Sequence, residues 1–112
     1  IIAYSPCIAH GIEGGLEVSK SQEKLATEVG YWPILRFDPR LVEKGKNPLQ
    51  LDSKNPKWEK YEEFLKTEIR YASLLKENPG HAKELFDINL KNAKETWNFY
   101  KRMASLDYSV ED

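Results

Sequence analysis

The chain has 112 residues, of which 40% are hydrophobic and 31% charged, and its 17 basic and 18 acidic side chains leave a formal net charge of −1. Without a basic excess we expect no nucleic-acid partner, and no apolar run approaches the roughly 20 residues that cross a bilayer, so we expect no membrane contact. The length suits one domain, and a single cysteine, which cannot form a disulfide within the chain, favours a reducing, cytoplasmic setting.

The first element predicted is a buried strand. Residues 1–5 form an apolar run of the kind that expects neighbours on both faces of a sheet. Pro6 lacks a backbone N–H and ends this strand, so a turn begins at Pro6-Cys7. The chain starts inside the apolar run and without Met. We therefore expect it to be a piece of a larger chain.

A helix, a second strand and a long loop are predicted next. Residues 16–29 indicate a weakly amphipathic helix, with Gly30 as its natural C-terminal cap. Residues 31–37 predict an edge strand or an extended segment, because Pro33 cannot donate to a ladder. Residues 38–57 show no hydrophobic period and predict an irregular loop of about 20 residues.

Two helices complete the chain. Apolar residues recur at spacings of three and four from Trp58 to Leu75, and again from Ala82 to Ala104, which is one face of a helix in each case. The breaker Asn-Pro-Gly at 78–80 separates them and favours an antiparallel helical hairpin over residues 58–104. The sequence thus predicts a single segment, 1–112, that is mostly α-helical with one or two short strands, made of a strand-helix-loop arm (1–57) and the hairpin.

Cys7 is the first candidate for chemistry, and three interpretations stand. It is a small buried packing residue, since cysteine without a disulfide is among the most buried residue types. It is a nucleophile activated by His10, although such pairs normally come from distant parts of a fold. Or it is a thiolate ligand of an iron–sulfur cluster whose other three ligands come from elsewhere. His10 itself is typical of a hydrogen-bonded structural residue.

Arg36 and Arg40 flank Asp38-Pro39 and form the second candidate. Two guanidinium groups could hold a phosphate or carboxylate through bidentate contacts, or anchor the loop through surface ion pairs. The sequence contains no glycine-rich phosphate motif, CxxC, HExxH or GxSxG. By itself the chain lacks the parts of a self-contained active site, and its composition also fits a non-catalytic helical interaction module.

Four stretches carry a family resemblance: YSPCIAHGI, QEKLATEVGYWPILRFDPRL, GKNPLQLDSK and EEFLKTEIRYASLLKENPGHAKELF. From Ile1 to about Ala104 the chain resembles the carboxy-terminal part of pyruvate:ferredoxin (flavodoxin) oxidoreductases. The resemblance implies a cytoplasmic, homodimeric parent enzyme that converts pyruvate and coenzyme A to acetyl-CoA and CO₂. It also implies thiamine diphosphate, Mg²⁺ and 4Fe–4S clusters as cofactors, with ferredoxin or flavodoxin as electron acceptor. A relative acting on another 2-oxoacid, or passing electrons to NADP, is the alternative within this class.

The resemblance also assigns a fold and a role to this segment. It implies an α/β parent domain of the thiamine-diphosphate-binding fold, of which these residues are the last part. Cys7 is then a ligand of the cluster nearest the thiamine, and the remaining cysteines, thiamine ligands and Mg²⁺ ligands lie before residue 1. Ala9 stands where the family often has Asn. No catalytic residue is expected in this chain, which by itself should be inactive.

Overall fold

The computed structural model describes residues 1–7 and 11–110, and most of them are helical. Two three-residue strands form the only sheet of this described part, an antiparallel pair. The elements in chain order are α1 (Ser19–Glu28), β1 (Leu35–Phe37), β2 (Leu49–Leu51), α2 (Tyr61–Thr67), α3 (Ile69–Glu77) and α4 (Pro79–Ala104), with 3₁₀ turns at Leu16–Val18, Pro39–Lys44 and Trp58–Lys60. The expectation of a mostly helical chain with one or two short strands is confirmed.

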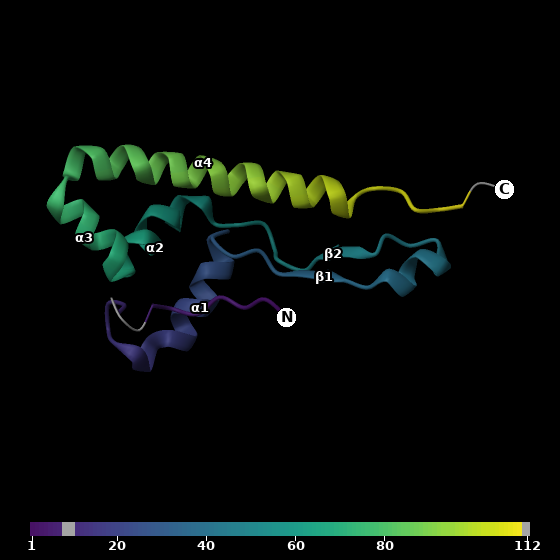
Figure 1. The fold of residues 1–112 in the computed structure, drawn as a ribbon, viewed down its shortest axis with the longest axis horizontal. Helices are drawn as coiled ribbons and strands as arrows, with labels where there is room; N and C mark the ends of the chain where they lie inside the picture. The colour runs from purple at the N-terminus through teal and green to yellow at the C-terminus, as the bar shows by residue number, and fades with distance from the viewer. Residues whose placement is uncertain (8–10, 111–112) are drawn as a thin grey trace.

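The molecule is elongated, with extents of 61 × 30 × 19 Å. Figure 1 shows α4 along one long edge, with α2 and α3 beside its N-terminal half and the β1–β2 pair beside its C-terminal half. One long helix therefore connects two ends of the molecule that are built in different ways.

An aromatic core fills the end formed by α1, α2, α3 and the first half of α4. Phe64 and Leu65 are fully buried there, as helical spacing places them on the inner face of α2. The ring of Tyr31 lies 4.9 Å from that of Phe64, and its hydroxyl lies 2.9 Å from that of Tyr71. The remaining buried members of this cluster are Ala26, Val29, Tyr61 and Phe86. The aromatic residues on the helical face predicted from Trp58 to Leu75 thus form the core or pack against it.

Gly30 ends α1 as predicted. Its φ of 85° is one that an L side chain rarely adopts. A Cβ at this position would lie 2.5 Å from the ring of Trp58 and 2.8 Å from Pro56. Glycine is therefore needed here both for the backbone turn and for the close approach of the next segment.

The strand predicted at residues 1–5 is absent. Residues 1–7 lie outside any helix or strand, and Ile1 and Ile2 are exposed. An apolar strand of this kind needs sheet neighbours on both sides, and no other described segment pairs with it.

The loop predicted at 38–57 contains regular structure that the sequence reading missed. Asp38 caps the 3₁₀ turn Pro39–Lys44 by accepting a hydrogen bond from the N–H of Arg40 at 3.1 Å. Leu49–Leu51 then forms β2 and pairs with β1, with Leu35 opposite Leu51. Elements this short are set by capping and by pairing with a distant strand, neither of which produces a hydrophobic period.

The helix predicted from Trp58 to Leu75 is interrupted at Glu68. The backbone of Glu68 is extended (φ −83°, ψ 114°), which separates α2 from α3. Glu68 instead forms an antiparallel bridge with Ile12. The next break, before α4, falls at Asn78 as predicted, and the side chain of Asn78 accepts from the N–H of His81 at 3.3 Å.

Candidate functional site

Cys7 lies at the end of the first described segment, residues 1–7. The thiol-bearing residue is half-buried and follows the buried Pro6. The N–H of Gly11 donates to the carbonyl of Cys7 at 2.8 Å, which holds the two residues together. The neighbouring candidates Ala9 and His10 lie outside the described residues.

The chain on the C-terminal side of Cys7 is held by backbone hydrogen bonds to the junction between α2 and α3. The N–H of Ile69 donates to the carbonyl of Gly11 at 3.2 Å, and the N–H of Glu13 donates to the carbonyl of Thr67 at 2.9 Å. Ile12, between them, is 4% exposed. This flank of Cys7 is therefore fixed like a strand, through main-chain atoms.

The chain on the N-terminal side is held by side chains at the same junction. The hydroxyl of Tyr4 donates to Oε1 of Glu68, and Nε2 of Gln22 donates to the same oxygen at 3.2 Å. Gln22 also donates to the hydroxyl oxygen of Thr67 at 2.9 Å. Gln22 and Glu68 are both 6% exposed. A carboxylate at this depth is tolerated because donors surround it.

Burial and the carboxylate act together on Tyr4. Desolvation of the phenol, its hydrogen bond to Glu68 and the nearby negative charge all raise the pKa of Tyr4 above its ordinary value. The hydroxyl therefore keeps its proton and remains a donor. The Tyr4 ring also packs edge-on against Tyr31, 5.7 Å away, and beside Trp32 at 6.1 Å.

Sequence reasoning did not identify Glu68, although a signal for it exists. Glu68 is four residues after Phe64, three after Leu65 and four before Ala72, all apolar positions of the predicted helix. A carboxylate on that face is predicted to be buried and in need of donors. Its partners, Tyr4 and Gln22, could not be found because they lie 64 and 46 residues away.

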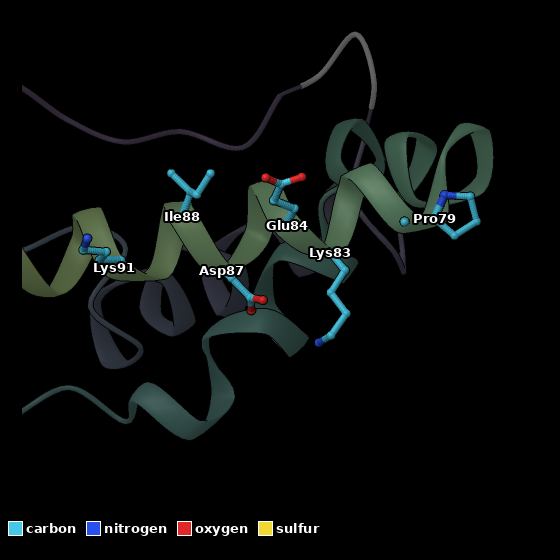
Figure 2. A pocket seen from close by; sticks show the side chains of 7 residues that line it. Pro79, Lys83, Glu84, Asp87, Ile88 and Lys91 are labelled. Carbon is cyan, nitrogen blue, oxygen red and sulfur yellow. The ribbon is translucent and has the colours of Figure 1, made fainter.

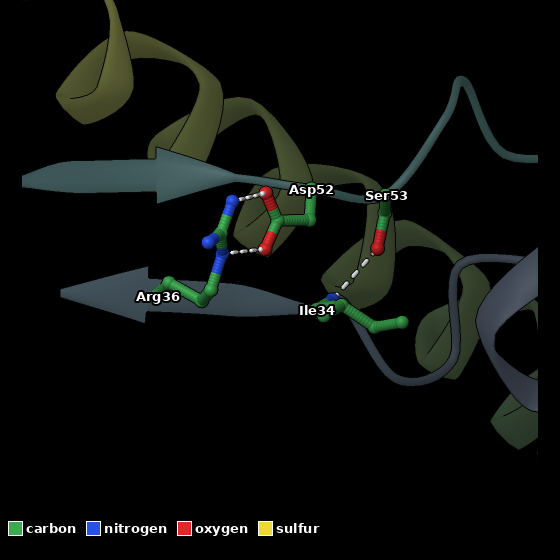
Figure 3. A network of polar contacts seen from close by, with 4 residues as sticks. All are labelled: Ile34, Arg36, Asp52 and Ser53. Atoms are coloured by element: carbon green, nitrogen blue, oxygen red, sulfur yellow. Dashed lines mark hydrogen bonds and ion pairs between the residues drawn. The ribbon is translucent and has the colours of Figure 1, made fainter.

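Arg36 is engaged within the β1–β2 pair. Its guanidinium donates from Nε and Nη2 to the carboxylate of Asp52 at 2.6 and 3.0 Å, across the two strands (Figure 3). Beside this pair the hydroxyl of Ser53 accepts from the N–H of Ile34 at 2.6 Å. The hydrogen-bonded guanidinium lowers the pKa of Asp52 below its ordinary value.

Arg40 is engaged in the same way with Asp38. Its Nε and Nη2 each lie 2.9 Å from a carboxylate oxygen, and these hydrogen bonds lower the pKa of Asp38 to about 2. The side chain of Arg40 is 83% exposed, and that of Arg36 is 69% exposed. The structure thus supports surface ion pairs at both positions, and the two arginines do not converge on a shared anion site.

One shallow hollow runs along the first half of α4. Figure 2 shows that its side chains lie on the two sides of a single helix, with Glu84 and Ile88 on one side and Lys83 and Asp87 on the other. Its lining residues are Pro79, Gly80, Lys83, Glu84, Asp87, Ile88 and Lys91. No second element contributes to the lining, so the hollow does not enclose a ligand.

A 4Fe–4S cluster requires four thiolate ligands, and the chain has one cysteine. Within residues 1–7 and 11–110, no three His, Cys, Asp or Glu side chains gather as a metal site. The chain can therefore supply one ligand to a cluster but cannot hold one alone. In the same residues, no helix combines the length and hydropathy needed to cross a bilayer.

Comparison with known proteins identifies relatives of the chain. It matches no protein-family model. It is 45% identical over 93% of its length to the pyruvate:ferredoxin oxidoreductase of Moorella thermoacetica, and 44% identical over 94% to the pyruvate-flavodoxin oxidoreductase of Enterobacter agglomerans. This chain is homologous to a segment of the pyruvate:ferredoxin and pyruvate-flavodoxin oxidoreductases. The resemblance found in the sequence is confirmed.

The homologous segment is short relative to these oxidoreductases. The chain spans 9% of the length of each of the two relatives above. A mitochondrial pyruvate dehydrogenase (NADP⁺) of Euglena gracilis is also similar, at 43% identity over 92% of the chain and 6% of that protein. Most of each oxidoreductase therefore lies outside the residues compared.

Proposed function

We propose that the chain is the C-terminal segment of an enzyme that oxidatively decarboxylates pyruvate with coenzyme A to acetyl-CoA and CO₂. The observation that carries this proposal is 40–45% identity to pyruvate:ferredoxin and pyruvate-flavodoxin oxidoreductases over at least 93% of the chain. The proposed parent is a cytoplasmic homodimer whose α/β domain, of the thiamine-diphosphate-binding fold, binds thiamine diphosphate and Mg²⁺ through residues outside this segment. The segment itself supplies no catalytic residue.

The proposed role of the segment is to present Cys7 as one of the four ligands of a 4Fe–4S cluster. Such a cluster passes single electrons, here toward ferredoxin or flavodoxin. Two observations support the role. Cys7 is half-buried rather than exposed, and the described residues on both of its flanks, Tyr4 and residues 11–13, are attached to the same helix junction. A ligand of a redox centre is expected to be held on rigid elements in this way.

The experiment is a Cys7→Ala variant of the full-length oxidoreductase, compared with Ser5→Ala. Ser5 is an exposed neighbour whose hydroxyl donates to the carbonyl of Pro6 at 3.4 Å, so it controls for substitution within residues 1–7. Iron is counted per chain, and electron paramagnetic resonance (EPR) spectra are recorded after reduction.

We expect Cys7→Ala to lose one cluster signal, about four irons per chain and coenzyme A-dependent pyruvate oxidation, while Ser5→Ala retains all three. If Cys7→Ala keeps every cluster, Cys7 is a packing residue and its proposed role is wrong. If the unaltered protein does not oxidise pyruvate, the proposed activity is wrong, whatever the variants do.

The electron acceptor and the 2-oxoacid are tested separately. The name of the Euglena relative specifies NADP⁺, so an NADP-linked enzyme is the second candidate. Initial rates are compared with ferredoxin, flavodoxin and NADP⁺ as acceptors, and with pyruvate against a larger 2-oxoacid. We expect pyruvate with ferredoxin or flavodoxin to be preferred; faster NADP⁺ reduction would favour the second candidate.

A further inference from the structure

The two flanks of Cys7 are attached by different means. On the C-terminal side, main-chain hydrogen bonds join residues 11–13 to residues 67–69. On the N-terminal side, no backbone hydrogen bond joins residues 1–6 to another described residue. The side-chain hydrogen bond from Tyr4 to Glu68, together with the packing of the Tyr4 ring, takes the place of a ladder.

A buried carboxylate at this position is energetically costly unless the hydrogen bonds that it accepts offset its desolvation. An apolar side chain of similar size would avoid the desolvation of Glu68. A carboxylate, however, forms stronger hydrogen bonds than a neutral acceptor. Gln22 donates to both Glu68 and Thr67, so the carboxylate is itself held in one orientation relative to α1.

We propose that Glu68 is a positioning residue, which fixes the N-terminal flank of Cys7 through Tyr4 and thereby sets where the Cys7 thiol is presented. The inference rests on the proposed role of Cys7 as a cluster ligand. Glu68 also lies at the extended break between α2 and α3, where it bridges Ile12. Its neighbours Thr67 and Ile69 hold residues 11–13 by main-chain hydrogen bonds, and its side chain accepts from Tyr4, so both flanks of Cys7 are attached at this junction.

The test compares Tyr4→Phe with Tyr71→Phe in the full-length oxidoreductase. Each variant removes one phenol hydroxyl from the same aromatic cluster, but the hydroxyl of Tyr71 pairs with that of Tyr31, whereas the hydroxyl of Tyr4 donates to Glu68. Two readouts are taken: amide hydrogen exchange of the peptide covering residues 1–13, and the midpoint potential and EPR line shape of each cluster at full iron content.

Tyr4→Phe should accelerate exchange in the peptide about tenfold, as expected for loss of one hydrogen bond to a charged group, and should shift the potential of one cluster only. Tyr71→Phe should do neither. Glu68→Ala should shift the potential as Tyr4→Phe does. Glu68→Gln should shift it less, because the amide oxygen still accepts from Tyr4.

Three results separate the inference from the proposal it rests on. Equal effects of Tyr4→Phe and Tyr71→Phe would overturn the inference, since the contact would then be ordinary packing. Faster exchange with no change in any potential would also overturn it, provided Cys7→Ala has lost a cluster. Faster exchange in an enzyme whose clusters survive Cys7→Ala would support the anchor and reject the ligand role of Cys7.

Discussion

The two ends of this molecule are stabilised in different ways. The aromatic end, formed by α1, α2, α3 and the first half of α4, buries Tyr61, Phe64 and Leu65 almost completely. The other end is named the hairpin end after its β1–β2 pair, not after the helical hairpin predicted at residues 58–104. It consists of β1, the 3₁₀ turn Pro39–Lys44, β2 and the second half of α4, and it leaves Phe37 67% exposed and Phe99 54% exposed. Burial of a large aromatic cluster dominates the first end, together with the buried polar contacts of Glu68, whereas the second end buries Trp97 and otherwise depends on exposed polar contacts.

Polar contacts define the geometry of the hairpin end, where burial is modest. The amide of Asn47 donates to the carbonyls of Met103 and Leu106 at 2.8 and 3.0 Å, which satisfies the C-terminal end of α4. Ion pairs of Arg36 and Arg40 add to this. Individual contacts of this kind contribute little free energy but define register and direction. The same substitution should therefore cost much more at one end than at the other.

The largest contrast is expected between Phe64→Ala and Phe37→Ala. Phe64 is 0% exposed, so its truncation should lower the free energy of unfolding by about 3–5 kcal/mol through lost burial and a cavity. Phe37 is 67% exposed, and its truncation should cost less than about 1 kcal/mol. Urea unfolding measures both. Similar losses would mean that the hairpin end has a core of its own.

A second contrast separates close packing from backbone strain. Gly30 and Gly45 both have positive φ, 85° and 66°, but only at Gly30 would a Cβ collide with neighbours, chiefly Trp58. Gly45→Ala should cost about 1 kcal/mol from its left-handed backbone alone. Gly30→Ala should cost about 1–3 kcal/mol more, from overpacking. Equal losses in urea unfolding would show that Trp58 moves aside freely.

Gly30 also shows what the sequence could predict. A glycine after an apolar-periodic run is a local signal, and the helix end, the break at Asn78 and the aromatic faces of α2 and α4 all follow from signals of this kind. The prediction of a strand at residues 1–5 was wrong. An apolar run indicates that a segment could be buried, but whether it forms a strand depends on pairing partners elsewhere in the chain.

The site was only partly predictable for the same reason. Cys7 could be singled out because it is the only thiol and follows a proline in a motif with a family resemblance. Glu68 was not, since its role depends on contacts with Tyr4 and Gln22 that span more than forty residues. For Arg36 and Arg40, sequence left an anion site and surface ion pairs open, and the positions of Asp52 and Asp38 favour the ion pairs.

Alkaline pH should weaken the aromatic end selectively. Burial first, then hydrogen bonding or nearby charge, raises the pKa of Tyr4 and Tyr31 above the ordinary value of 10.0, and burial raises that of Tyr61. Because the folded state favours the protonated phenols, their contribution is complete below pH 10.0 and is lost as pH rises beyond it, with a slope of at most about 1.4 kcal/mol per pH unit for each group.

The measurement is urea unfolding between about pH 9 and about pH 11, with Tyr31→Phe as the comparison. Removing a phenol whose pKa is raised in the fold should flatten the decline of the unfolding free energy with pH. A decline as steep in Tyr31→Phe as in the unaltered chain would assign the alkaline loss to other groups.

The smallest effect is expected from Asp38→Asn at the hairpin end. Asparagine caps a helical turn as well as aspartate does, so the variant keeps the contact with the N–H of Arg40 and removes only the charge. Arg40 lowers the pKa of Asp38 to about 2 from an ordinary 3.8, so the ion pair stabilises the fold above about pH 4 and is lost as pH falls toward 2.

The free energy of unfolding of each protein is measured at about pH 7 and about pH 3. The change between the two pH values should be smaller in Asp38→Asn than in the unaltered chain. High salt should erase the difference in stability between the two proteins at about pH 7. A difference that persists in high salt would mean that the fold depends on this pair for more than exposed charge, and the contrast between the two ends would be weaker than burial indicates.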